Sequence, residues 1–311
     1  MLKTICRGAA VLSLLSTMAV QSAHGAQELP VLPAGEPTLL TDPYLQNPTD
    51  AGVSVVWLTN FSGRSNAVVI ELEGRRDKNG NAQEIHYIAE TQELDRLLED
   101  NSSKLEMDIP LVSQRVAYRH EAMVDGLDQG KRYTYRIVSK THEGEVFTAG
   151  PFQLQALPKP GTPLKILLTS DQQERFNTLA NYQKVAETFP QLDAIFFAGD
   201  LANHPRRGSE WLDNYRTSWH ENPRSASPSF FPALQGTFTN RVPESPFAGA
   251  PLLQNVPLFP SVANHEVSGR FRPNEQYLLG GTLRTANINS IFGDPQPRWY
   301  AEHLYEDRED M

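Results

Sequence analysis

This sequence has almost no cysteine. The single one, Cys6, lies near the start of a 311-residue chain, ahead of an apolar run that ends at Val20. If the amino-terminal segment is removed, the rest of the chain has no cysteine and cannot form a disulfide. Its stability must then come from buried apolar surface. Domains above about 100 residues bury enough surface for this. Because Cys6 precedes the apolar run, the sequence does not indicate a lipid anchor.

Basic residues are also scarce. The chain has 28 lysines and arginines against 37 acidic residues, which gives a net charge of −9, and it carries no basic stripe. An acidic protein has no general attraction to nucleic acid or to an anionic membrane, so we expect neither as a partner. The sequence gives no indication of an oligomeric state.

The first 25 residues have the pattern of a targeting segment. Lys3 and Arg7 precede an apolar run over residues 9–20, and small residues follow it up to Ala26. The run is shorter than the ~20 residues of a spanning helix and is typical of a secretory signal. We predict that residues 1–25 are a signal peptide, which implies a secreted or periplasmic protein. The alternative is a buried amino-terminal helix.

Residues 38–156 show the alternation of β-strands. Val53, Val55 and Trp57 share one face, as in a half-buried strand. Asn79-Gly80 is a hairpin signal, and the calcium loop that begins similarly at Asp77 is excluded by Ile88 at its twelfth position. Further strands are expected over residues 66–72, 84–89, 118–124, 132–138 and 145–154. The pattern predicts an antiparallel β-sandwich, preceded by an extended linker over residues 26–37.

The pattern changes after Pro158-Lys159-Pro160-Gly161. In residues 163–311, short apolar runs at 164–168, 194–197 and 256–262 are expected to be strands, the first two buried on both faces. Residues 174–189 carry apolar side chains at helical spacing between the first two runs. Strand, helix and strand in this order predict a parallel α/β second domain. Trp211, Tyr215 and Trp219, four residues apart, are expected to pack one helix face against the core.

Polar side chains follow each of these three apolar runs. Asp171 follows the first, Asp200 and Asn203 the second, and Asn264-His265-Glu266 the third. The carboxyl ends of parallel strands meet at one edge of a sheet, so we expect these residues to converge there. Their oxygens suit divalent or trivalent metal ions. The alternative is that the aspartates cap loops and that His265 lies in a surface turn.

These motifs resemble those of the metallophosphoesterases, which have an aspartate, then Gly-Asp, then Asn-His-Glu in the same order. In addition, Pro43-Tyr44-Leu45-Gln46-Asn47-Pro48 and residues 53–59 resemble the amino-terminal domain of purple acid phosphatases. The resemblance implies a fibronectin-like β-sandwich followed by a partial metallophosphoesterase α/β sandwich. It also implies hydrolysis of small phosphate monoesters by two metal ions (Fe, Zn or Mn). A phosphodiesterase on the same scaffold, or an inactive binding protein, is the alternative.

The resemblance also implies residue roles. Asp171 would ligate one metal ion, Asp200 would bridge both, Asn264 would ligate the second, and His265 would donate to the leaving-group oxygen. The purple enzymes have tyrosine where Asn203 stands, so a ferric tyrosinate is not expected, and Asn203 is a neutral oxygen ligand at most. His204 could substitute for a ligand there. Many relatives have a histidine at Gln173.

Two histidine segments that supply ligands in the family have no counterpart downstream of His265, since His303 matches neither pattern. Three or four ligands are too few for two ions, and the second half of the catalytic domain is expected to be missing. We therefore expect the 311-residue chain to be inactive by itself and to leave apolar sheet surface uncovered. His204, His220 and His303 are the candidate substitute ligands.

Overall fold

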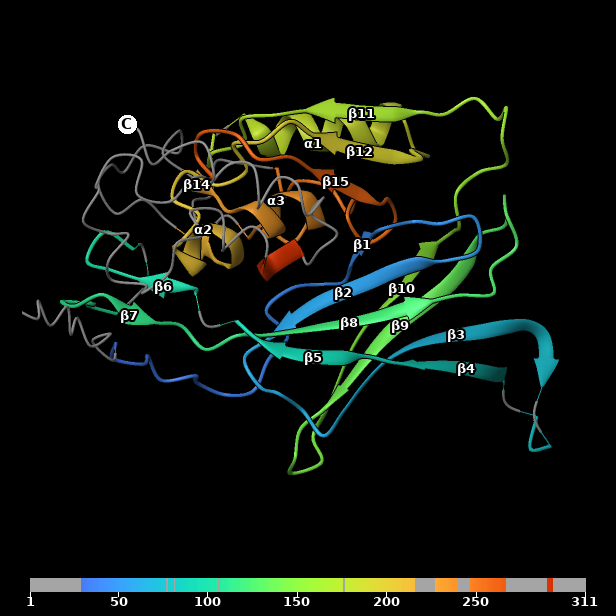
Figure 1. The fold of residues 1–311 in the computed structure, drawn as a ribbon, viewed down its shortest axis with the longest axis horizontal. Helices are drawn as coiled ribbons and strands as arrows, with labels where there is room; N and C mark the ends of the chain where they lie inside the picture. The colour runs from blue at the N-terminus through green and yellow to red at the C-terminus, as the bar shows by residue number, and fades with distance from the viewer. Residues whose placement is uncertain are drawn as a thin grey trace, which may run out of the picture.

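The computed structural model describes residues 29–215, apart from 77, 81, 95, 104, 106 and 176, together with residues 227–239, 247–266 and 290–292. Several features predicted from the sequence lie outside this part: the signal peptide, Trp219, His220 and His303. The described residues form an antiparallel sandwich followed by a small parallel sheet with helices (Figure 1).

Two four-stranded antiparallel sheets form the predicted sandwich. The first has the order β1 (Tyr44–Gln46), β2 (Val53–Thr59), β8 (Tyr118–Val124) and β5 (Glu90–Glu93). The second has the order β10 (Val146–Leu154), β9 (Tyr133–Lys140), β3 (Ser65–Arg76) and β4 (Ala82–Ile88). A separate two-stranded ribbon consists of β6 (Leu98–Glu99) and β7 (Ser113–Gln114). Buried side chains such as Trp57, Ile70 and Tyr135 fill the space between the two large sheets.

Turn residues set the connections of the sandwich as predicted. The β3–β4 pair extends to Arg76 opposite Ala82, and Gly80 in the connection has φ +83°. The hydroxyl of Tyr133 accepts the Asp128 N–H and donates to the Asp128 carboxylate, at 3.1 and 3.0 Å, which closes a tyrosine corner at the start of β9. The expected linker is extended but not isolated. Its residues 30–32 pair with Gln114 of β7 through two backbone hydrogen bonds.

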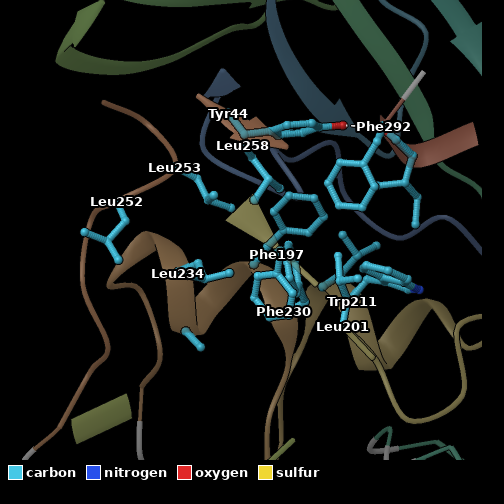
Figure 2. Packing of buried hydrophobic residues seen from close by; sticks show 14 of the residues in the cluster. Tyr44, Phe197, Leu201, Trp211, Phe230, Leu234, Leu252, Leu253, Leu258 and Phe292 are labelled. Atoms are coloured by element: carbon cyan, nitrogen blue, oxygen red, sulfur yellow. Dashed lines mark hydrogen bonds between the residues drawn. The ribbon is translucent and has the colours of Figure 1, made fainter. Parts of the chain in front are cut away.

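Strand β2 is buried on both faces, which corrects the prediction of a half-buried strand. Val53, Val55 and Trp57 point into the sandwich, whereas Val56 and Leu58 belong to a second core. That second core also contains Tyr44 of β1 and many side chains from the later part of the chain (Figure 2). The two parts of the molecule therefore share this second apolar core, which we call the shared core.

The parallel sheet has the order β11 (Ile166–Thr169), β12 (Ala194–Phe197) and β15 (Leu258–Pro260). Helix α1 (Thr178–Thr188) connects β11 to β12, as the predicted strand–helix–strand order requires. Two short helices, α2 (Gly208–Leu212) and α3 (Phe230–Gln235), lie between this sheet and the sandwich (Figure 1). A two-residue pair, β13 (Asn214–Tyr215) with β14 (Ser227–Pro228), accompanies them.

In the part of the chain that the structure describes, the parallel sheet is covered on one face only. Leu168 is 74% exposed and Ile166 46% on β11, and Phe196 is 40% exposed on β12, so neither strand is buried on both faces as its apolar sequence predicted. The alternate residues Leu167, Ile195 and Phe197 face the shared core. The expected uncovered apolar surface is therefore present on the face that carries Ile166, Leu168 and Phe196.

The aromatic residues that follow β12 are placed differently from the prediction. Trp211 is fully buried on α2, where it contacts Phe230, Phe231 and Phe292. Helix α2 ends at Leu212, however, and Tyr215 belongs to β13 rather than to the same helix face. Among the described helices, none is long and apolar enough to cross a lipid bilayer.

Candidate functional site

The polar segments after β11, β12 and β15 meet at one edge of the sheet, as the parallel order predicted. Asp171 follows β11, and its N–H donates to the carbonyl of Gly199 after β12 at 3.2 Å. The segment after β12 in turn lies against the one after β15. Gly199 and Ala263 are so close that a Cβ added to Gly199 would be 2.3 Å from the Cβ of Ala263. Only glycine fits at position 199, which also has φ +80°.

The backbone at this edge is unusually strained. Of the five non-glycine residues with positive φ in the described ranges, four lie here: Asp171 (+55°), Gln173 (+37°), Glu174 (+59°) and Asp200 (+57°). Such conformations cost free energy and persist where the surrounding contacts enforce them. Their concentration at one edge points to a site with a required geometry.

The Asp200 side chain is buried and accepts two hydrogen bonds. Its Oδ1 accepts the backbone N–H of His265 at 3.0 Å, and its Oδ2 accepts the side-chain amide of Gln173 at 2.7 Å. One carboxylate therefore joins residues from all three strand ends. Gln173, which stands where a ligating histidine was noted as missing, donates directly to the predicted bridging group.

A hydrogen bond to the backbone of Asn203 holds the imidazole ring of His265 in place. Its Nδ1 lies 2.8 Å from the backbone carbonyl of Asn203. A carbonyl oxygen can only accept, so Nδ1 carries a proton and Nε2 is the acceptor in the neutral ring. The predicted roles of Asn203 and His265 are thus linked, although it is the Asn203 backbone that makes this contact.

Of the remaining predicted ligands, Asp171 and Asn264 are exposed and Asn203 is half-buried. Asp171 accepts the Ser170 hydroxyl at 2.6 Å, and Asn264 lies at the surface next to His265. The Asn203 amide nitrogen is 3.2 Å from Nδ1 of His204. The structure brings Asp171, Asp200 and the Asn264–His265 pair to one edge but does not show the Asn203 side chain joined to them.

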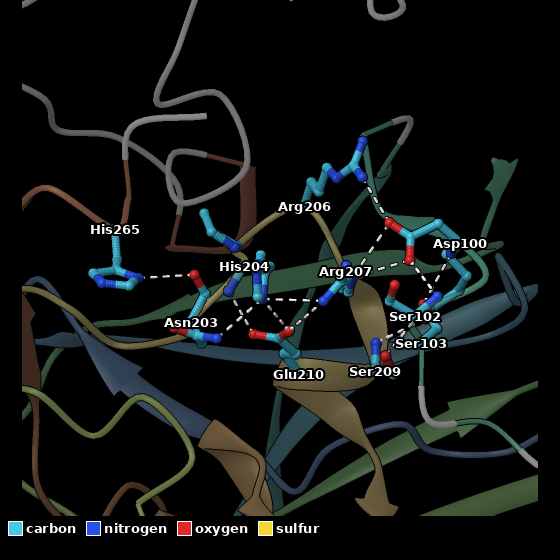
Figure 3. A network of polar contacts seen from close by, with 12 residues as sticks. Asp100, Ser102, Ser103, Asn203, His204, Arg206, Arg207, Ser209, Glu210 and His265 are labelled. Carbon is cyan, nitrogen blue, oxygen red and sulfur yellow. Dashed lines mark hydrogen bonds and ion pairs between the residues drawn. The ribbon is translucent and has the colours of Figure 1, made fainter. Parts of the chain in front are cut away.

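His204, the candidate substitute ligand, takes part in an ion-pair network instead (Figure 3). Its Nδ1 is 2.8 Å from Glu210 Oε1, and Arg207 also contacts Glu210. Arg207 and Arg206 bind Asp100, which follows β6 of the sandwich. Burial alone would raise the pKa of Asp100, but the Ser102 N–H and the two arginines outweigh it and lower that pKa. The network connects the loop that carries Asn203 to the sandwich.

Hydrogen bonds and ion pairs of the neighbouring residues Glu99 and Arg115 also connect this part of the chain to the sandwich. Glu99 of β6 accepts the Ser209 N–H at 2.7 Å and the Ser209 hydroxyl at 2.8 Å, and it contacts Arg115 at 3.1 Å. Arg115 also pairs with Asp213 after α2. Burial raises the pKa of Glu99, which Arg115 and Ser209 partly offset. These residues were not singled out by the sequence, because their partners are about 100 positions away.

The described residues do not complete a centre for two metal ions. Within the residues that the structure describes, no group of three histidine, cysteine, aspartate or glutamate side chains could hold an ion together. Asp171, Asp200 and Asn264 supply oxygens of a suitable kind, but both Asp200 oxygens already accept N–H groups. A dinuclear centre needs more ligands than these.

Comparison with known proteins shows a likeness of fold. No protein-family model and no curated protein matches the sequence. A purple acid phosphatase from yellow lupin (Lupinus luteus) seeds superimposes with a TM-score of 0.51 at 16% identity, over 84% of this chain and 41% of that chain. The chain thus spans less than half the length of that enzyme. At this identity the match shows the fold alone.

Two other solved structures match weakly. A bromine derivative of BhCBM56 has a TM-score of 0.23 at 15% identity, over 39% of this chain and 99% of that chain. A family 123 glycoside hydrolase from Clostridium perfringens has a TM-score of 0.19 at 12% identity, over 49% of this chain and 32% of that one. Neither score supports an inference about this protein.

Proposed function

We propose that this chain is the sandwich and first sheet half of a metal-dependent phosphate ester hydrolase that acts on small phosphate monoesters. The observation that carries the proposal is the convergence of Asp171, Asp200 and His265 at the carboxyl edge of β11, β12 and β15, on strained backbone. The fold likeness to a purple acid phosphatase supports it. The predicted signal peptide supports action in a secreted or periplasmic compartment.

In this function, the oxygens of Asp171, Asp200 and Asn264, with Asn203 as the fourth ligand, would hold two metal ions such as Fe, Zn or Mn. Bound ions of this kind polarise a phosphoryl group and activate water. Because the described ligands are too few, the proposal requires further ligands beyond them. Metal content per chain, measured on purified protein after loading with Mn²⁺, Zn²⁺ or iron, tests this requirement directly.

His265 is the proposed proton donor to the leaving-group oxygen. Since Nδ1 already donates to Asn203, donation to a substrate requires a second proton on Nε2. We expect His265→Ala to lower turnover of esters with poor leaving groups by ~10²–10⁴-fold and to affect activated aryl esters much less. Equal losses on both classes would show that His265 has another role.

The substrate class can be tested with chromogenic esters. In protein that holds two metal ions, p-nitrophenyl phosphate should be hydrolysed faster than bis(p-nitrophenyl) phosphate, and Asp200→Asn should remove that activity, whereas the 311-residue chain by itself is expected to be inactive. Faster turnover of the diester would identify a phosphodiesterase. Absence of turnover in protein that holds two metal ions would contradict the proposed function, and a protein that binds no metal would favour the binding-protein alternative.

A further inference from the structure

Glu266 is a buried carboxylate that the proposed function leaves without a role. It is 1% exposed and follows directly after His265. Its Oε2 accepts the backbone N–H groups of Asp200 at 2.8 Å and Ala263 at 2.9 Å, and its Oε1 accepts that of Leu201 at 2.7 Å. The side chain therefore binds three backbone donors from two strand ends, those after β12 and β15.

The same two segments are joined by two further contacts, each from a side chain to the opposite backbone. The Asp200 carboxylate accepts the His265 N–H, and the His265 imidazole donates to the Asn203 carbonyl. Together with Glu266 these contacts form a series of side-chain to backbone hydrogen bonds, which we call the ladder. The Glu266 side chain binds the backbone of Asp200, and the Asp200 side chain binds the backbone of His265. The His265 side chain then binds the backbone of Asn203.

Glu266 is poorly placed to act on a substrate or an ion itself. Both of its oxygens already accept backbone N–H groups, and burial separates them from solvent. Charge-assisted bonds from a carboxylate to backbone N–H groups are among the stronger hydrogen bonds in proteins. They are suited to holding Asp200 at its left-handed φ of +57°, a conformation that an aspartate does not favour by itself.

We propose that Glu266 is a positioning residue, which sets the orientation of the Asp200 carboxylate and, through it, of His265. The part of this inference that concerns catalysis rests on the proposed function. The part that concerns geometry does not, because the ladder consists of hydrogen bonds in the chain itself. The two parts can therefore be tested separately.

The test is residue-resolved amide hydrogen exchange on the full chain, with Glu266→Gln and the matched control Glu99→Gln. Glu99 is also a buried glutamate that accepts backbone and side-chain donors, but its partners Ser209 and Arg115 are not residues of the ladder. In Glu266→Gln we expect the His265 N–H, which Glu266 does not touch, to exchange about tenfold faster or more. In Glu99→Gln it should exchange as in the parent protein. Equal His265 exchange in both variants would overturn the inference.

A second variant covers the case in which Glu266→Gln does not fold. Glu266→Asp keeps the charge but is one methylene shorter, so it should hold one of the two segments and lose the other, with intermediate His265 exchange. In a parent protein that hydrolyses phosphate esters, Glu266→Gln should lower kcat by about 10²-fold and change KM much less. Unchanged kcat would refute the positioning role alone. A parent that holds two metal ions but has no activity would refute the proposed function, while the exchange pattern would still decide the role of Glu266.

Discussion

His120 of β8 is expected to make the stability of this protein depend on pH. The side chain is fully buried between the sheets, with Trp57 beside it at a ring distance of 5.4 Å. Its Nε2 lies 2.8 Å from the hydroxyl of Thr59 and its Nδ1 lies 2.9 Å from that of Thr91. Thr59 in turn donates to the carbonyl of Phe61, so it accepts from Nε2–H, and Thr91 donates to Nδ1. Every hydrogen bond of the neutral ring is satisfied.

Burial lowers the pKa of His120 from 6.5 to about 4. Between these values the unfolded chain binds a proton at His120 that the folded chain does not, so lowering the pH favours unfolding. The contribution is fully present above pH 6.5 and is lost as the pH falls toward 4. At 1.36 kcal/mol per pKa unit the loss is about 3 kcal/mol, which is a large part of the stability of a typical domain.

The assay is the free energy of unfolding by urea at several pH values between 7.5 and 4, for the parent and for His120→Gln. Glutamine offers a donor and an acceptor as neutral histidine does, but it does not titrate. We expect the variant to be less stable at neutral pH, and this deficit to shrink by about 3 kcal/mol as the pH falls to 4. His86→Gln is the control, because the side chain of His86 is 54% exposed on β4. A deficit that stays constant with pH would refute the reasoning.

Three further predictions follow from the packing and from the site. Leu58→Ala should cost about 2–5 kcal/mol in the free energy of unfolding, because Leu58 is fully buried in the shared core, whereas Ile88→Ala at an exposed position of β4 should cost far less. Gly199→Ala should lower the free energy of unfolding by about 1–3 kcal/mol more than Gly161→Ala does. Both glycines have positive φ, but only a Cβ at position 199 meets Ala263. Similar losses for the two variants in chemical denaturation would contradict this. Finally, iron-loaded protein should show no strong visible absorption band, because Asn203 cannot form a tyrosinate; a purple preparation whose colour is lost on mutation of a nearby tyrosine would refute that assignment.

Local patterns predicted most of the elements but not their surroundings. The alternation in Val53–Thr59 identified β2, and the turn residues identified the β3–β4 hairpin. The second buried face of β2 could not be predicted, because Val56 and Leu58 are covered by residues about 150 positions later. Similarly, the apolar sequence of β11 indicated burial on both faces, whereas one face is uncovered in the described structure.

The sequence predicted which residues converge at the candidate site but not the hydrogen bonds that hold them there. The strand-end rule brought Asp171, Asp200 and His265 together correctly, because it depends only on the direction of the strands. The role of Glu266 was missed, although the residue was noted beside His265, since its three partners are backbone groups that leave no trace in the sequence. His204 was considered as a ligand, but its contact with Glu210 depends on a turn that the sequence did not reveal.

The shared core has a consequence for how this protein can change in evolution. Because Tyr44 packs against Phe231 of α3, and Val56 and Leu58 belong to the same core, the sandwich is not an exchangeable module. A sandwich with the same strands but a polar outer face would remove the apolar contact of Phe231 with Tyr44 and the sandwich side of the shared core. Substitutions in the outer face of β1 and β2 must therefore be matched by substitutions in α2 and α3. We expect the two halves to diversify together rather than by shuffling.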